Sequence, residues 1–464
     1  MTSESARDPI YGGLTEELHA IVGQRLTTAP ATREQHGRDE SYHASRPPDV
    51  VVFAASTEEI SDIINVCARR RVPVIPFGTG TSLEGHVAAL EGGVCIDLAQ
   101  MNEVLAVNVE DMDCTVQAGV TRKQLSEHLR DTGLFFAVDP GADASIGGMA
   151  ATRASGTNAV RYGTMRETVL ALTVVLADGR IIRTSRRARK SSAGYDLTRL
   201  FVGSEGTLGV IAEVTLRLHG VPEAISAAVC AFPDLAAAVN TTIAIIHSGV
   251  PVARIELLDD VQMKAINKYS KLDYPEAPTL FFEFHGTEAG VVEQVKMVEA
   301  IAGDFGDSDF QWATKAEDRA QLWQARHDAY YAAIALRPGS KGYATDVCVP
   351  ISRLAECIEE TRKDIEDSGL LAPIVGHVGD GNFHLVMVLD PDDPDEMARA
   401  KALNERLVMR GLAMDGTCTG EHGVGYGKID FLLAEHGEAV SVMRTIKTAL
   451  DPLGIMNPGK IVRV

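Results

Sequence analysis

Two histidines flank a tight-turn signal in the segment that runs from Gly376 to His384. The dipeptide Asp380-Gly381 favours a two-residue turn of type I′ between apolar strands. With that turn, His377 lies directly opposite His384, and opposed residues share one face of a hairpin with Cβ atoms about 4.5–5.5 Å apart. Two imidazoles at this separation can bind one metal ion. The alternative is that both are ordinary buried histidines.

A Gly-rich loop over residues 416–425 carries an acidic and a basic side chain next to each other, Glu421 and His422. Glu421 can complete a His-His-carboxylate ligand set, which suits Zn²⁺ or Mn²⁺ and leaves positions open for substrate oxygens. Cys418, a softer ligand in the same loop, competes with Glu421 and ranks below it.

The elements before a second Gly-rich loop follow the order strand, helix, strand, which is typical of nucleotide binding. Residues 48–53 are extended, Ser56 and Glu59 form a capping box at the start of a helix, and residues 72–76 form the second strand. Backbone N–H groups and hydroxyls of the loop could hold a pyrophosphate, and a structural turn is the alternative. The Rossmann pattern fails because position 83 is leucine, and the P-loop pattern is also absent. The candidate cofactor-binding residues here are Pro76, Gly78, Thr79, Gly80, Thr81, Ser82, Gly85 and His86.

A further segment, residues 140–163, is so poor in large side chains that we expect no core element in it. Such a chain is ordered most easily by packing on a flat, rigid group, as a flavin and its diphosphate would be. A flexible loop is the alternative. The candidate contacts are Pro140, Gly141, Ala144, Ser145, Gly147, Gly148, Thr152, Ser155 and Gly156.

The sequence pattern changes near Gly220. From there on, β-rich runs alternate with helical runs, which predicts an antiparallel sheet covered by helices on one face. The expected fold class is α+β. We expect a cofactor-binding domain over residues 1–220, a substrate- and metal-binding domain over 221–453, and a short tail over 454–464.

Composition excludes several classes of protein. The net charge of −20 argues against a nucleic-acid partner, which would need a cationic surface. No apolar run reaches the roughly 18–20 residues of a transmembrane helix, and the first residues lack the features of a signal or transit peptide. Seven cysteines without a C-x-x-C pair indicate a reducing compartment, for which the cytosol is the simplest prediction.

The two small-residue segments, together with residues 203–211, resemble the FAD domain of the vanillyl-alcohol oxidase and p-cresol methylhydroxylase flavoproteins. The similarity runs along nearly the whole chain, and the most similar branch is the FAD-linked D-lactate dehydrogenases. The resemblance implies a two-lobed FAD-binding domain and FAD bound without a covalent bond, although some relatives attach flavin at the position of His86. It also implies FAD contacts at Glu205 and Ile211, and a C-terminal motif that returns to the flavin with Asn457.

The resemblance also assigns roles at the substrate site. It implies that His377, His384 and Glu421 bind the metal, that His422 is the general base, and that Arg326 binds the substrate carboxylate; a surface salt bridge is the alternative for Arg326. The implied reaction oxidises a D-2-hydroxy acid: the metal acidifies the hydroxyl, the base takes its proton, and hydride passes to flavin N5.

Two apolar positions narrow the substrate. The D-2-hydroxyglutarate dehydrogenases carry polar or basic residues near the positions of Ala344 and Val386, so we expect a monocarboxylate such as D-lactate. D-2-hydroxyglutarate, or glycolate in a multisubunit oxidase, remains an alternative, as does a metal-binding module or hydrolase without redox activity. The expected electron acceptor is a cytochrome, a quinone or an electron-transfer flavoprotein, and a homodimer is one of the open oligomeric states.

Overall fold

The computed structural model describes residues 13–306 and 308–464 and divides them into two compact units. The first unit comprises residues up to 154, residues 164–220 and residues 421–464. The second unit comprises residues 155–163 and 221–420. The chain thus returns to the first unit at residue 421, whereas the sequence pattern placed that return at residue 454.

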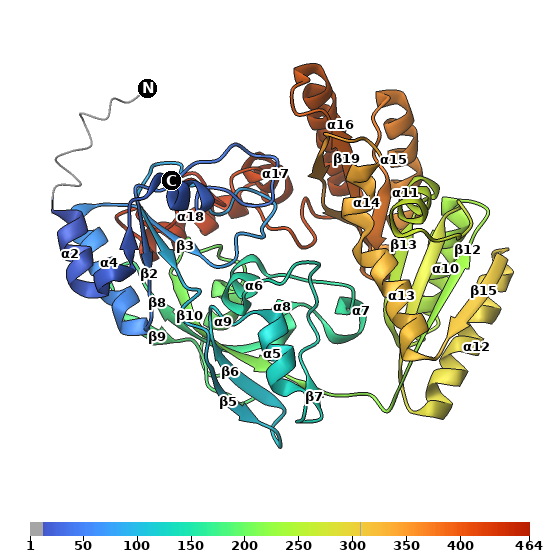
Figure 1. Ribbon diagram of the computed structural model, residues 1–464, viewed down its shortest axis with the longest axis horizontal. Helices are drawn as coiled ribbons and strands as arrows, with labels where there is room; N and C mark the ends of the chain where they lie inside the picture. Colours follow the sequence, from blue (N-terminus) through green and yellow to red (C-terminus); the bar gives the residue numbers. More distant parts are fainter. Residues whose placement is uncertain (1–12, 307) are drawn as a thin grey trace. The chain divides into compact units, whose positions relative to one another are not determined.

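The first unit contains a four-stranded, mostly parallel sheet with strand order β1-β2-β4-β3 (Figure 1). Strands β2, β4 and β3 run parallel, and β1 joins β2 antiparallel. The C-terminal segment adds to the far edge, because the N–H of Asn457 donates to the carbonyl of Val74. The strands are β1 (Leu26–Thr27), β2 (Val50–Phe53), β3 (Val74–Phe77) and β4 (Val94–Asp97).

Helix α4 (Thr57–Arg70) packs in the core beside this sheet and begins where the sequence predicts it. The hydroxyl of Ser56 accepts a hydrogen bond from the N–H of Glu59, which satisfies a free donor of the first turn. Ile60 and Ile63 are completely buried. Their helical spacing therefore points the apolar face of the helix into the core.

The second sheet of the first unit has five antiparallel strands in the order β5-β6-β10-β8-β9. Its strands are β5 (Val104–Asn108), β6 (Asp113–Gln117), β8 (Val169–Val175), β9 (Ile181–Arg183) and β10 (Val210–Arg217). Helix α5 (Arg122–Leu129) opens with a capping box, in which Thr121 and Gln124 satisfy each other's backbone donors.

The small-residue segment forms a core helix, so the expectation that it contributes no core element is wrong. Helix α6 (Ile146–Thr152) starts at Ser145, whose hydroxyl accepts from the N–H of Gly148. A Cβ at Gly147 would lie 2.5 Å from the Cβ of Ala118, so the helix approaches the chain beneath it too closely for a side chain there. The small residues allow this close packing instead of preventing it.

The second unit is built on an antiparallel sheet with order β15-β12-β14-β13-β18-β19-β16, and β17 also pairs with β19. The antiparallel sheet predicted for this half of the chain is confirmed. The strands are β12 (Ala224–Ala231), β13 (Val252–Leu258), β14 (Thr279–Gly286), β15 (Ser308–Ala313), β16 (Lys341–Ala344), β17 (Val347–Cys348), β18 (Ile374–His377) and β19 (Asn382–Leu389).

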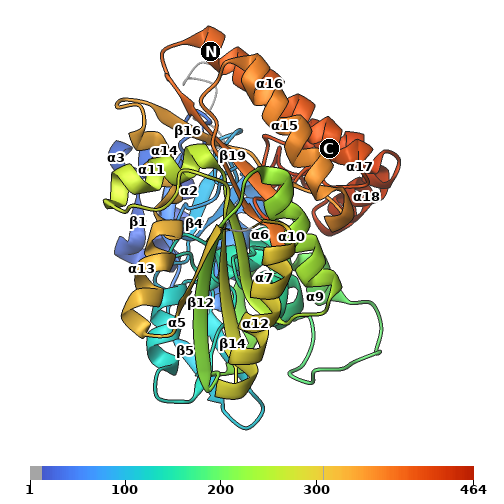
Figure 2. The same ribbon diagram turned by 90° about the vertical axis from the view of Figure 1, so that its right-hand side faces the viewer.

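Helices cover both faces of this sheet, whereas one covered face was expected (Figure 2). Helices α11, α13 and α14 pack on one face, where Val229 meets Trp323, and α10, α12 and α15 lie on the other. Every residue of β19 is buried, which is typical of a strand enclosed on both sides. The helices are α10 (Leu235–His247), α11 (Asp260–Ser270), α12 (Glu288–Asp304), α13 (Ala316–His327), α14 (Ala329–Ala335) and α15 (Leu354–Ser368).

Within the described ranges, no helix is both long enough and apolar enough to cross a bilayer. All seven cysteines lie in these ranges, and none of them forms a disulfide.

Candidate active site

The histidine hairpin forms, but its register differs from the predicted one. His377 pairs with Asn382, and His384 pairs with Val375. The two-residue type I′ loop is wrong: a short 3-10 turn over Val378–Asp380 is followed by Gly381 with φ of 79°. A Cβ at Gly381 would lie 2.1 Å from a backbone carbonyl oxygen of the segment after β17, so the turn is set by a tertiary contact.

The two histidines are nevertheless neighbours. Moving the pairing by two residues keeps each side chain on its face of the sheet, so His377 and His384 become diagonal neighbours on one face. Their ring centroids are 5.6 Å apart and the ring planes are nearly perpendicular, at 82°.

Acceptors hold the Nδ1 atom of each ring. His377 Nδ1 lies 2.7 Å from Glu256 Oε1, and His384 Nδ1 lies 2.9 Å from the carbonyl oxygen of Thr345. Both acceptors lack a proton to donate, so each Nδ1 carries the hydrogen and each Nε2 presents its lone pair. This is how proteins usually orient metal-ligating histidines.

Glu421 completes a ligand set that fits a divalent cation. One ligand atom each from His377, His384 and Glu421 lies within 4.8 Å of the other two. Glu421 directly follows Gly420, which packs so tightly on the hairpin that a Cβ there would lie 2.3 Å from Asn382 Nδ2. Two imidazoles and one carboxylate suit Zn²⁺ or Mn²⁺. Cys418 is buried and is not in this group.

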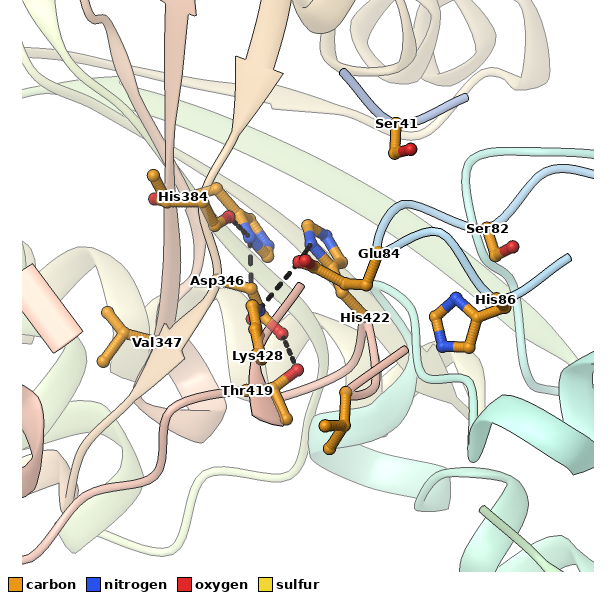
Figure 3. Close-up of polar contacts among 12 residues, drawn as sticks. Ser41, Ser82, Glu84, His86, Asp346, Val347, His384, Thr419, His422 and Lys428 are labelled. Carbon is orange, nitrogen blue, oxygen red and sulfur yellow. Dashed lines mark hydrogen bonds and ion pairs between the residues drawn. The ribbon is translucent and has the colours of Figure 1, made fainter. Parts of the chain in front are cut away.

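Asp346, which the sequence analysis missed, ties the hairpin to the loop before Glu421 (Figure 3). Its buried carboxylate accepts hydrogen bonds from Asn382 Nδ2 at 2.7 Å and from Thr419 Oγ1 at 2.6 Å. One of its oxygens also lies 3.7 Å from His384 Nδ1. The available signal was an acidic residue placed between the short apolar strands β16 and β17.

Glu256 is a second residue that the sequence analysis missed. It lies in the middle of β13 and is completely buried, yet burial, which disfavours its charge, is outweighed by His377 and Arg326, and the pKa of its carboxyl is lowered. Arg326 is only 12% exposed and donates to Glu256 from α13. Arg326 therefore forms a salt bridge that is largely buried and does not lie on the surface.

In the first unit, the two small-residue segments come together. A Cβ at Gly78 would lie 2.3 Å from Ser145 Oγ, so the loop after β3 reaches the start of α6. The hydroxyl of Ser82 donates to Asp39, and the hydroxyl of Thr152 donates to the carbonyl of Gly148.

The remaining cofactor candidates are distributed as follows. Ser155 and Gly156 belong to the second unit. Those in the first unit are Pro76, in β3; Thr79, Gly80, Thr81 and Gly85, in the loop after it; Pro140, Gly141 and Ala144, before α6; Gly147 and Gly148, in α6; and Ile211, in β10.

His86 and Glu205 form a buried pair at the centre of the first unit. His86 Nε2 lies 3.3 Å from Glu205 Oε2, and the same carboxylate accepts from the N–H groups of Val424 and Gly425. Burial opposes the charge on both side chains, but their mutual attraction is stronger, so the pKa of His86 is raised and that of Glu205 is lowered. Asn457 joins them by donating to the carbonyls of His86 and Glu205.

This cluster retains polar atoms that fit a flavin. Among the described residues, His86 Nδ1, Ser204 Oγ and Asn457 Oδ1 are buried atoms without a hydrogen-bond partner. Buried polar atoms are normally paired, and a polar ring system with carbonyl and N–H groups would satisfy them. The residues present therefore fit an isoalloxazine.

His422 also lies in the first unit, with its Nδ1 3.8 Å from Glu84 Oε1. The same carboxylate oxygen is 2.9 Å from the ammonium group of Lys428 (Figure 3). Glu84 and Lys428 were not predicted; both are buried charges, and Glu84 lies inside the Gly-rich loop.

Ala344 and Val386 pair directly with each other across β16 and β19. These are the two positions from which the sequence analysis limits the range of expected substrates. Val386 is 3% exposed. The pair forms one continuous apolar contact at this edge of the sheet.

Comparison with known proteins identifies the family to which the chain is similar. Residues 48–185 match the family model "FAD binding domain", and residues 221–461 match "FAD linked oxidases, C-terminal domain". The chain is 57% identical to a probable mitochondrial D-lactate dehydrogenase of Danio rerio, covering 99% of this chain and 94% of the relative. It is 50% identical to the mitochondrial D-lactate dehydrogenase [cytochrome] of Arabidopsis thaliana, covering 97% and 80%.

Among solved structures, p-cresol methylhydroxylase with bound substrate superposes with a TM-score of 0.78 at 16% identity, covering 98% of this chain and 97% of that one. The predicted fold, an FAD domain of the p-cresol methylhydroxylase type joined to an α+β domain, is confirmed.

One prediction is overturned by the relatives. Both are named as mitochondrial, which points away from the cytosolic location expected from the cysteines. Free cysteines report a reducing environment, and this property does not distinguish the cytosol from another reducing compartment.

Proposed function

The chain belongs to the FAD-linked oxidases, in the branch of the FAD-linked D-lactate dehydrogenases, and on that premise we propose that it oxidises D-lactate to pyruvate with the help of a divalent metal. The observation that carries this proposal is the grouping of His377, His384 and Glu421, with Arg326 linked to His377 through Glu256. This grouping supports a metal-binding function next to an anion-binding function.

Each residue has a defined task in this reaction. When bound, FAD supplies the hydride acceptor, and Zn²⁺ or Mn²⁺ supplies a Lewis acid that lowers the pKa of the substrate hydroxyl. His377, His384 and Glu421 would hold the ion. Arg326 binds the carboxylate of the substrate, because its planar guanidinium matches a carboxylate. His422 accepts the hydroxyl proton as general base.

The apolar pair Ala344 and Val386 supports a monocarboxylate substrate. A second carboxylate near these side chains would lose its hydration without gaining a partner. We therefore propose D-lactate over D-2-hydroxyglutarate. For the next electron acceptor we propose a cytochrome, in keeping with the name of the Arabidopsis thaliana relative.

A substrate panel tests the proposal. The purified protein, with FAD and either Zn²⁺ or Mn²⁺, is assayed with an artificial dye on D-lactate, L-lactate, glycolate and D-2-hydroxyglutarate. We expect the highest kcat/KM for D-lactate. A higher value for D-2-hydroxyglutarate or glycolate would assign the chain to one of those substrates. A protein that stays colourless after incubation with FAD would favour the non-redox metal-binding module.

A further inference from the structure

Glu256 serves two residues of the substrate site at once. We propose that it is a positioning residue that fixes the metal ligand His377 with one carboxylate oxygen and the substrate-binding Arg326 with the other. This inference rests on the proposed function for the roles of those two residues. In this role Glu256 would act through His377 and Arg326.

The contacts divide cleanly between the two oxygens. Oε1 lies 2.7 Å from His377 Nδ1. Oε2 lies 2.9 Å from Nε and 2.7 Å from a terminal nitrogen of Arg326. The three side chains come from β13, β18 and α13, which are distant in sequence, so Glu256 is the point at which these elements are joined.

Burial of the Glu256 side chain makes a charge on its carboxylate energetically costly. Glu256 is completely buried in the middle of a strand, and an ionised carboxylate without partners is very unfavourable there. The charge is retained because a guanidinium and an imidazole N–H both donate to it. A residue kept charged at such a cost is expected to have a task beyond packing.

The contacts to Glu256 engage neither Nε2 of His377 nor the whole guanidinium of Arg326. With Nδ1–H of His377 bound, Nε2 presents its lone pair for a metal. With Nε and one terminal nitrogen of Arg326 engaged, the remaining N–H groups of the guanidinium can bind the substrate carboxylate. One carboxylate therefore sets the direction of both the metal bond and the anion contact.

Glutamine at this position can satisfy only one partner. If its oxygen faces Arg326, its NH₂ group faces His377 Nδ1 and favours the tautomer that carries the proton on Nε2, the nitrogen needed for the metal. If its oxygen faces His377, the NH₂ group opposes the guanidinium, donor against donor. Either orientation impairs one of the two functions.

The neighbouring strand provides a matched control. Glu283 in β14 is also buried and also holds one histidine and one arginine: its Oε1 lies 2.8 Å from His285 Nε2 and 3.4 Å from Arg254 Nε. Neither of these partners belongs to the metal or carboxylate site. Glu283→Gln therefore reproduces the loss of a buried charge at partners that are neither the proposed metal ligands nor the proposed carboxylate-binding arginine.

The experiment compares Glu256→Gln, Glu283→Gln and the wild type as FAD-loaded proteins. Zn²⁺ affinity is measured by equilibrium dialysis against a competing chelator, independently of turnover. We expect Glu256→Gln to bind Zn²⁺ about 10–100-fold more weakly than the wild type, and Glu283→Gln to remain within about twofold of it. At saturating metal, the KM for D-lactate should also rise in Glu256→Gln because Arg326 is displaced.

Equal Zn²⁺ affinity in the wild type and Glu256→Gln, or equal losses in both glutamine variants, would overturn the proposal. If Glu256→Gln does not fold, Glu256→Asp is compared with Glu283→Asp, and equal affinities for Zn²⁺ overturn it in the same way. A wild type that binds Zn²⁺ in a Glu256-dependent manner but does not oxidise D-lactate would refute the proposed function and leave the orientation of His377 by Glu256 standing.

Discussion

At the scale of single residues, buried charges mark the site more clearly than small residues do. Glu84, Glu205 and Glu256 are all buried, and the carboxylate of each contacts a neighbouring side chain or backbone N–H group. Buried carboxylates without partners are rare because their desolvation is costly. Each of these three buried carboxylates therefore indicates that the position of the group it contacts is important.

His422 provides a test at this scale. We expect His422→Gln to lower kcat by about 100- to 10,000-fold, because the variant lacks a general base for the hydroxyl proton. Flavin absorbance and bound metal should stay at wild-type levels, since His422 is not in the metal-ligand group. The half-exposed His436 supplies a control, as His436→Gln should keep full turnover. Near-normal kcat in His422→Gln would reassign the base.

Single residues also show which features can be predicted from the amino-acid sequence and which cannot. The hairpin that carries the two histidines and the N-cap at Ser56 were predicted because their signals are local in the sequence. Glu256 and Asp346 were missed because their partners lie on strands or loops that are distant in sequence. A buried acid in an apolar strand is visible in the sequence, but its partner is known only once the sheet is assembled.

At the scale of elements, the hairpin between β18 and β19 illustrates both success and failure. The turn dipeptide predicted a hairpin, and period-two alternation predicted a shared face for the histidines, which the structure retains. The register was wrong because Gly381 meets the backbone of Val349, a contact that no local pattern reveals. The face of the sheet on which a side chain lies is therefore predicted more reliably than the residue with which it pairs across the strands.

The end of strand β4 yields a pH prediction. His36, just after α3 (Pro30–Gln35), has one ring nitrogen 2.8 Å from the carbonyl of Thr32 and the other 2.8 Å from Asp97, the last residue of β4. Burial opposes its charge, but these acceptors outweigh burial and raise the pKa of His36. A raised folded pKa means that the stabilisation is complete below the unfolded value of about 6.5 and is lost as pH rises through the folded pKa.

Thermal or urea unfolding between pH 6 and pH 9 measures this effect. The wild-type free energy of unfolding should fall across this window, and the fall should be shallower in His36→Gln, which has no proton to lose. An identical pH profile for the two proteins would show that another group controls the slope.

At the scale of the whole molecule, the proposed flavin contacts and the proposed metal ligands are different residues. The polar cluster that fits a flavin lies in the first unit; of the proposed metal ligands, Glu421 lies in the first unit and His377 and His384 lie in the second. Removal of one cofactor is therefore expected to leave the other in place.

Dialysis against a chelator tests this separation. We expect turnover of D-lactate to be lost while flavin absorbance is unchanged, and addition of Zn²⁺ or Mn²⁺ to restore turnover. Release of flavin together with the metal would contradict the separation. Full turnover after complete removal of metal would contradict the metal-assisted reaction.

The pairing of Met456 with Val74 has a consequence for a shortened chain. Ile455 and Met456 fill the core beside α4, and Asn457 bonds the backbone of both His86 and Glu205. A chain that ends before Asn457 would therefore lack both the core contacts of Ile455 and Met456 and one residue of the polar cluster that fits a flavin.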